Sequence, residues 1–260
     1  MQVLSHRLRS FRVTFPRRQT AQVIYVEHQL AAALDELGLA RSRPTLVLTG
    51  GANHLDRRAA RRLQQFFKHC LVPLAETLQL TVIDGGTDSG VMRLMGRGRS
   101  RHRATFPLVG IAPASKIHLP RTPPLPGTYP LEPHHTHFIL TPGSDWGSES
   151  PWIAQTATLL ANNQPSITLL INGGSVSLLD VQASLTENRP TFVLLGTGRL
   201  ADEIATAIRS PHTQIRTELA AILQTGRNQI FLLDGAKTGA ELLTVLSRQF
   251  VDGDAAQSAK

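Results

Sequence analysis

The stretch ITLLINGGSVSLLD (Ile167–Asp180) decides the fold. Its first part, 167–171, is a short apolar run that predicts a buried strand, and residues 176–186 follow a helical pattern. An Asn-Gly-Gly-Ser turn lies between them. Glycines let the backbone approach an anion closely, and free N–H groups at a helix N-terminus attract negative charge. The stretch therefore predicts a strand, a turn that can hold a phosphate group, and a helix.

Outward from this stretch, short apolar runs alternate with helical patterns. Strands are expected at 11–15, 22–26, 45–49, 80–83, 108–111, 137–140, 167–171, 192–195 and 229–233. Helices are expected at 27–39, 55–78, from 91 onward, 151–161, 176–186, 200–209, 213–224 and 238–249, with Pro73 kinking or dividing the second. This alternation predicts an α/β protein with a Rossmann-like three-layer α/β/α fold and a mostly parallel central sheet.

No change in composition marks a second domain. We therefore expect a single domain over 1–260, with a core at about 41–250 and the strands and helix of 1–40 packed on it. The segment 113–133 is long and rich in proline, and is expected to be a loop without regular elements that covers the site or forms a fixed wall. The end of the chain, 252–260, is expected to be a frayed tail.

Composition limits the class of protein. Of the 260 residues 41% are hydrophobic, as in globular proteins, and no apolar run approaches the roughly 20 residues that span a bilayer. The N-terminus has no apolar core of signal-peptide length, which predicts a cytoplasmic protein. A single cysteine, Cys70, excludes an internal disulfide and a cysteine-based zinc site. The net charge of +8 and the pI near 10.7 favour anionic partners.

Small residues follow several expected strands, at the carboxyl edge where open α/β sheets bind ligands. This pattern predicts a phosphate-bearing ligand. The expected ligand-binding residues at these ends and beside them are Gly50, Gly51, Gly85, Gly86, Thr87, Gly90, Ala112, Asn172, Gly173, Gly174, Ser175, Gly196 and Gly198.

Six motifs in order resemble the SLOG superfamily. They are VIDGGTDSGVM (82–92), VGIAP (109–113), LEPHHTHFIL (131–140), WGSESP (146–151), LLINGGSVSLLD (169–180) and GTGRLADEIA (196–205). The chain is most similar to the TRPM-like prokaryotic group (LSDAT), whose relatives include the N-terminal cytosolic domain of melastatin TRP channels. More distant relatives are the Lonely Guy phosphoribohydrolases and the DNA-processing proteins. The similarity covers about 45–210.

The resemblance implies binding of an adenine or NAD-derived nucleotide, such as ADP-ribose or cyclic ADP-ribose, with no separate cofactor. It implies that Gly85, Gly86, Thr87 and Gly90 form one phosphate-binding turn, and that Gly173, Gly174 and Ser175 form another. Arg199 matches a Gly-Ser-Gly-Arg element and is a candidate phosphate or ribose partner, since a guanidinium presents a fork of donors. Asp202 either orients Arg199 or suits the start of its helix. Glu149 matches an acidic position that would accept ribose hydroxyl groups.

Two other functions remain open. The Lonely Guy resemblance implies N-glycosidic hydrolysis of a nucleotide, with Asp180 or Glu149 as the catalytic carboxyl group. Asn172, Val176 and the shorter Asp180 depart from that enzyme motif and weaken this interpretation. DNA binding is less favoured, and would rest on the pI and on the arginines of 93–103. A binding protein without turnover would need a partner, either an unidentified effector protein or a second copy in a homodimer.

The histidines His134, His135 and His137 suggest a metal site, but we expect none. The motif is expected to lack a carboxylate or cysteine partner nearby, and strand alternation would place His135 and His137 on one face. The channel family carries a similar Asn-His-Ser-His run, which favours a structural role or one at the edge of the ligand.

Overall fold

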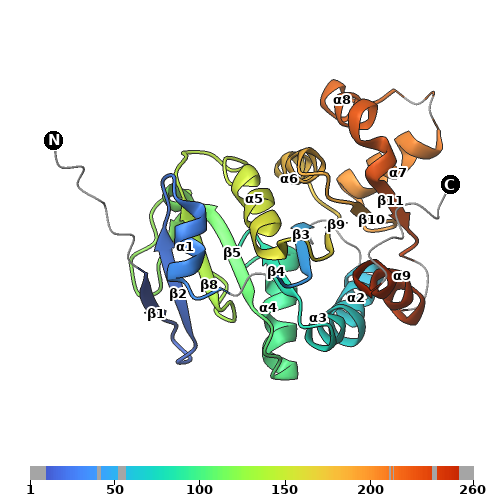
Figure 1. The fold of residues 1–260 in the computed structure, drawn as a ribbon. Coiled ribbons are helices and arrows are strands. Elements are labelled where there is room, and N and C mark those ends of the chain that lie inside the picture. Colours follow the sequence, from blue (N-terminus) through green and yellow to red (C-terminus); the bar gives the residue numbers. More distant parts are fainter. Residues whose placement is uncertain are drawn as a thin grey trace.

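The computed structural model describes residues 10–39, 42–51, 57–210, 212, 214–235 and 239–251, and shows a nine-stranded sheet between two layers of helices (Figure 1). The strands of this sheet are β1 (Phe11–Thr14), β2 (Thr20–Tyr25), β3 (Thr45–Gly50), β4 (Thr81–Asp84), β5 (Leu108–Pro113), β8 (His137–Thr141), β9 (Ser166–Ile171), β10 (Thr191–Leu194) and β11 (Ile230–Leu233). Each expected strand is confirmed to within two residues at either end. The predicted three-layer α/β/α class is likewise confirmed.

The helices alternate with these strands. They are α1 (Leu30–Glu36), α2 (Arg57–Phe66), α3 (Val72–Thr77), α4 (Gly90–His102), α5 (Ser150–Ala161), α6 (Ser175–Thr186), α7 (Arg199–Arg209), α8 (Thr217–Gly226) and α9 (Gly239–Val251). The helix expected from 213 thus begins at Thr217, after an extended Arg216. Residues 55, 56, 238 and 252–260, where two helix starts and the tail were expected, lie outside the described residues. Among the described helices, none has the length and apolar character needed to cross a bilayer.

The strand order is β1-β2-β8-β5-β4-β3-β9-β10-β11, and every neighbouring pair is parallel except β1 with β2. The N-terminal strands therefore extend the main sheet, because β2 pairs with β8. From β3 the chain builds outward through β4, β5 and β8, and then returns to place β9 on the other side of β3. The boundary between β3 and β9 is the topological switch point, where such sheets bind ligands.

Residue alternation along β3 directs its side chains into two different hydrophobic clusters, one on each face of the sheet. Leu46 and Leu48 of β3 face the side covered by α2, α3, α4 and α9. Val47 faces the opposite side, which α1 and α5 cover (Figure 1). Apolar residues on both faces are what a sheet covered by two helical layers requires, and they explain the continuous apolar runs of the sequence.

Pro73 divides the long expected helix in a particular way. A five-residue π-helix, Phe67–Leu71, lies between α2 and α3, and Pro73 falls in the first turn of α3. Proline has no N–H group, and its ring clashes with the carbonyl group four residues earlier in an α-helix. The wider turn, in which the Val72 N–H group bonds to the Phe67 carbonyl oxygen, accommodates that ring without ending the helix.

The segment 113–133 is not wholly irregular, which corrects the expectation. It contains a short 3₁₀ turn (Ala114–Lys116) and a parallel pair of two-residue strands, β6 (Ile117–His118) and β7 (Tyr129–Pro130). A bridge between Thr87 and Leu131 ties its end to the turn after β4. The segment is thus anchored beside the carboxyl edge of the sheet.

Candidate functional site

A cavity of about 360 Å³ lies at the switch point, at the carboxyl ends of β3, β4 and β9. Many of the predicted residues come together here. Those that line the cavity are Gly50, Gly51, Gly85, Thr87, Gly90, Glu149, Gly173, Gly174, Ser175, Asp180 and Arg199. The predicted residues Gly86, Ala112, Asn172, Gly196 and Gly198 do not line it.

The turn between β9 and α6 presents backbone N–H groups to this cavity. Gly173 has a φ of +90°, and Gly174 is the N-cap of α6. No side chain in the described part of the chain caps this helix. The first-turn N–H groups of α6 and its dipole are therefore available to an anion.

Asn172 holds this turn in place through hydrogen bonds to Gly173 and Thr197. Its side-chain oxygen accepts the N–H of Gly173 at 2.9 Å, and its amide nitrogen donates to the carbonyl oxygen of Thr197 at 2.6 Å. The Asn172 N–H in turn donates to the hydroxyl oxygen of Thr197 at 2.8 Å. Asn172 is buried, with a φ of 59°, so it supports the glycine turn and does not reach the cavity.

A second helix starts at the same cavity. Ser89 is the N-cap of α4, and here too no described side chain supplies a cap. Gly85, Thr87 and Gly90 bring the turn after β4 to the cavity wall. Gly86, by contrast, packs inward: an added Cβ atom would lie 2.8 Å from the Cα atom of Gly110.

Arg199 lies at the rim, as the first residue of α7. A Cβ atom added to Gly174 would lie 2.6 Å from the Nη2 atom of Arg199, so the guanidinium lies directly over the glycine turn. The neighbouring glycines have a different role. The N–H groups of Gly196 and Gly198 donate to the carboxylate of Asp202 at 2.7 and 2.9 Å. Asp202 therefore satisfies N–H groups of the turn that begins α7, which agrees with the second role considered for it, at the start of the helix.

The surroundings of Ala112 and Gly50 indicate that both residues serve the packing of the sheet. Ala112 is buried in an apolar cluster with residues of β1, β2 and β8, among them Phe138. Gly50 has a φ of +130°, and an added Cβ atom would lie 1.8 Å from the carbonyl oxygen of Ile171. Glycine is thus required where β3 and β9 separate and the cavity opens.

Two carboxyl groups share the cavity. Asp180 accepts hydrogen bonds from the hydroxyl groups of Thr49 and Ser150, both at 2.5 Å. Glu149 accepts the N–H of Gly147 at 2.6 Å, and only 3% of its surface is exposed. Burial and the neighbouring carboxylate of Asp180 raise the pKa of Glu149 to about 7, and burial also raises that of Asp180. A carboxyl group with a pKa near 7 can donate or accept a proton at neutral pH.

Two aromatic side chains complete the wall, and the sequence reasoning did not select them. Tyr129 of β7 and Trp146 line the cavity, with ring centroids 5.7 Å apart and planes at 75°. Trp146 begins the WGSESP motif, and that was the only signal for it in the sequence. Such rings offer a flat apolar surface to a planar base.

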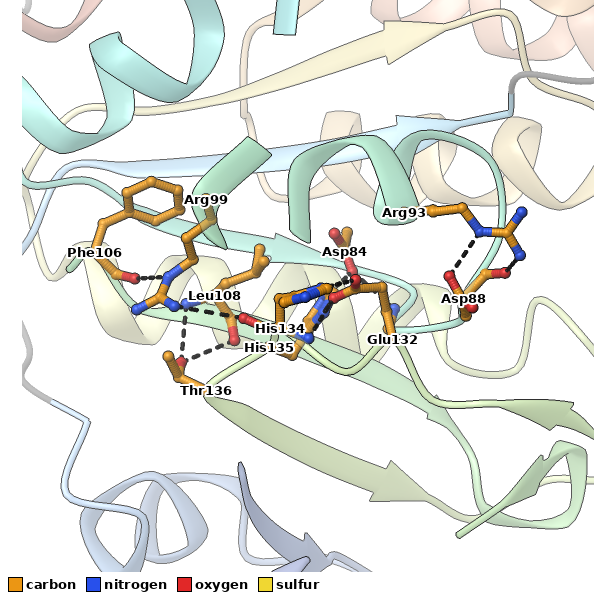
Figure 2. A network of polar contacts seen from close by, with 11 residues as sticks. Asp84, Asp88, Arg93, Arg99, Phe106, Leu108, Glu132, His134, His135 and Thr136 are labelled. Carbon is orange, nitrogen blue, oxygen red and sulfur yellow. Dashed lines mark hydrogen bonds and ion pairs between the residues drawn. The ribbon is translucent and has the colours of Figure 1, made fainter. Parts of the chain in front are cut away.

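The histidine cluster does have carboxylate partners, so the expectation that none lay nearby is wrong. Glu132 contacts the rings of His134 and His135, and Asp84, the last residue of β4, contacts His135 (Figure 2). His134 and His135 lie in the turn before β8, so strand alternation does not apply to them. Within the described residues, no group of three or more potential metal ligands is arranged to hold an ion.

The arginines of 93–103 include two with internal partners. Arg93 bonds to the side chain and the carbonyl oxygen of Asp88. Arg99 donates to the carbonyl oxygen of Phe106 at 2.8 Å and lies over its ring. Part of this run therefore stabilises the fold, so the charge of the whole run is weak support for DNA binding.

Comparison with known proteins identifies relatives. Residues 43–243 match the family described as "SLOG in TRPM, prokaryote". The rat transient receptor potential cation channel subfamily M member 2 is 25% identical over 214 residues, and its mouse counterpart is 24% identical. These matches cover 68% of this chain but 14% of each channel. A solved molybdenum cofactor binding protein from Rippkaea orientalis has a TM-score of 0.48 at 12% identity, covering 78% of this chain and 95% of its own.

Proposed function

The chain belongs to the family "SLOG in TRPM, prokaryote", and on that premise we propose that it binds an NAD-derived nucleotide of the ADP-ribose or cyclic ADP-ribose class. Binding takes place in the switch-point cavity and involves no turnover. The observation that carries this proposal is the meeting of two uncapped helix N-termini, those of α4 and α6, at one glycine-lined cavity. Two such termini favour a ligand with more than one phosphate group.

The other walls fit the remaining parts of a nucleotide. The guanidinium of Arg199, above Gly174, supplies the positive charge that a diphosphate needs. The rings of Tyr129 and Trp146 offer a surface on which adenine can lie. Glu149, with one oxygen held by Gly147, can exchange hydrogen bonds with ribose hydroxyl groups.

A thermal-shift screen tests the proposal. NAD, ADP-ribose, cyclic ADP-ribose, AMP and ATP are added in turn, and each incubation is then analysed by chromatography. The proposal expects stabilisation by an NAD-derived diphosphate nucleotide with the nucleotide recovered intact. Stabilisation by none of these nucleotides would refute it.

One observation favours a second function, N-glycosidic hydrolysis. Glu149 and Asp180 share the cavity, and the pKa of Glu149 is raised to about 7, as a general acid requires. However, both oxygens of Asp180 already accept hydroxyl groups, which leaves Glu149 the better placed acid. Release of a free base in the chromatogram, lost in Glu149→Gln or Asp180→Ala, would establish the enzyme in place of the binding protein.

A further inference from the structure

A buried chain of charged groups lies behind the turn that follows β4 (Figure 2). The Nε2 atom of His135 lies 2.8 Å from the Oδ1 atom of Asp84, and its Nδ1 atom lies 3.0 Å from the Oε2 atom of Glu132. All three side chains have no exposed surface. Residues 84 and 135 are 51 positions apart, so this contact joins two distant parts of the chain.

The imidazole of His135 must carry both ring protons to donate to two carboxylates. Burial alone would lower the pKa of His135, but Asp84 and Glu132 together raise it to about 9. Burial likewise opposes ionisation of Glu132, yet hydrogen bonds from His134 and His135 lower its pKa to about 2. At neutral pH His135 is therefore a cation that lies between two carboxyl groups, and Arg99 brings a second positive charge near Glu132.

This unit holds the backbone of the glycine turn. The Oδ1 atom of Asp84 that meets His135 also accepts the N–H of Gly86 at 2.7 Å. The N–H of Glu132 donates to the carbonyl oxygen of Gly86 at 2.9 Å. Both backbone groups of Gly86 are thus fixed by the charged unit, one residue away from Gly85 and Thr87 in the cavity wall.

The surroundings leave the unit little freedom. The ring of His135 stacks on that of Phe138 at 5.2 Å, and Phe138 in turn packs against Gly86. A Cβ atom added to Gly96 of α4 would lie 2.0 Å from the carboxylate of Glu132. The Oδ2 atom of Asp84 is buried with no hydrogen-bond partner in the described chain, so His135 is the group that offsets the charge of Asp84.

We propose that Asp84, His135 and Glu132 are positioning residues that hold the turn at 85–90 in the conformation that receives the phosphate groups of the ligand. They do not line the cavity, so their effect passes through the backbone of Gly86. This inference rests on the proposed function for the identity of the ligand. On this proposal the histidine motif supports the phosphate site, from the side of the turn at 85–90 that faces away from the cavity.

His135→Gln is the first test. One amide group cannot donate to two carboxylates on opposite sides. Asp84 therefore loses the neighbouring cation, and its hydrogen bond with the N–H group of Gly86 weakens. Amide hydrogen exchange, followed by NMR without ligand, should be at least tenfold faster at Gly86. The affinity for ADP-ribose, measured by calorimetry, should fall at least tenfold. His137→Gln is the matched control: His137 bonds to Thr136 and not to the charged unit, so both readouts should stay at wild-type values.

A conservative pair separates positioning from general stability. Asp84→Asn keeps an oxygen that can accept the N–H of Gly86, whereas Asp84→Ala removes it. Exchange at Gly86 and affinity for ADP-ribose should therefore be closer to wild type in Asp84→Asn than in Asp84→Ala. All variants are compared at a temperature at which thermal melting shows them folded. If the others do not fold, exchange at Gly86 and affinity for ADP-ribose are compared between Asp84→Asn and the wild type.

The outcomes divide cleanly. The inference would be overturned if the Gly86 amide of His135→Gln exchanged at the wild-type rate. It would also be overturned if the wild type bound ADP-ribose and His135→Gln bound it with the same affinity. Equal effects of Asp84→Asn and Asp84→Ala on exchange and affinity would also overturn it. The charge of Asp84 would then stabilise the fold in general, and its hydrogen bond to Gly86 would have no separate effect. If wild-type protein binds none of the nucleotides of the thermal-shift screen, the proposed function fails, and exchange at Gly86 still decides whether the unit holds the turn.

Discussion

Replacing Glu149 with glutamine should stabilise the protein at high pH and not at low pH. Glu149 is buried beside Asp180, and its pKa rises from 4.5 to about 7 in the folded chain. Below pH 4.5 the group is protonated in both states and has no effect on stability. Between pH 4.5 and 7 the unfolded chain releases the proton and the folded chain keeps it, so stability falls as pH rises.

The magnitude follows from the shift. A difference of about 2.5 pKa units at 1.36 kcal/mol each gives a penalty of roughly 3 kcal/mol above pH 7. Glutamine stays neutral at every pH, and its oxygen can still accept the N–H of Gly147. The difference in unfolding free energy between Glu149→Gln and wild type should therefore rise by about 3 kcal/mol from pH 4 to pH 8.

Urea unfolding at a series of pH values measures this difference. Groups that are not electrostatically coupled to Glu149 titrate in both proteins and cancel, and Glu27→Gln, at an exposed position, controls for the change of side chain. A rise of less than about 1 kcal/mol for Glu149→Gln would refute the argument, since the shift it requires would then be absent. That result would also remove Glu149 as a general acid at neutral pH.

Three other changes test the remaining walls. Gly50→Ala should lower the unfolding free energy by about 3 kcal/mol or more, because its Cβ atom would meet the carbonyl oxygen of Ile171 at a φ of +130°; a loss under about 1 kcal/mol in urea unfolding would contradict this. Arg199→Ala should weaken ADP-ribose binding more than tenfold, about 1.4 kcal/mol, in calorimetry, whereas the exposed Arg97→Ala should not; equal effects would point to general charge attraction. Trp146→Ala should weaken ADP-ribose binding by about 1 kcal/mol or more if adenine stacks there, and an unchanged dissociation constant would place the base elsewhere.

Local patterns were enough to predict the elements of the sheet and the glycine turns. The apolar run 167–171 and the glycines at 173 and 174 act within a few residues, so they can be recognised along the chain. The carboxyl-edge rule then predicted a ligand at the small residues that follow β3, β4, β5, β9 and β10. The structure brings the ends of β3, β4 and β9 to one cavity, whereas Ala112, Gly196 and Gly198 do not line it.

Contacts between distant segments could not be predicted in this way. The sequence gives no sign that His135 meets Asp84, since the pairing depends on β4, β5 and β8 lying side by side. Tyr129 reaches the cavity because the proline-rich segment folds back through β6 and β7. Gly196 and Gly198 looked like a phosphate turn, but Asp202 occupies their N–H groups. Glycine spacing does not show which partner a turn has.

The most direct test of the central claim is a calorimetric titration of ADP-ribose into wild-type protein and Gly174→Val. The added side chain would displace the guanidinium of Arg199 and block the start of α6, while the fold can accommodate it because the clashing atom ends a flexible side chain. Binding to the wild type and its loss in a variant with unchanged melting temperature would agree with a diphosphate held at this turn. Equal binding by both proteins would contradict that placement.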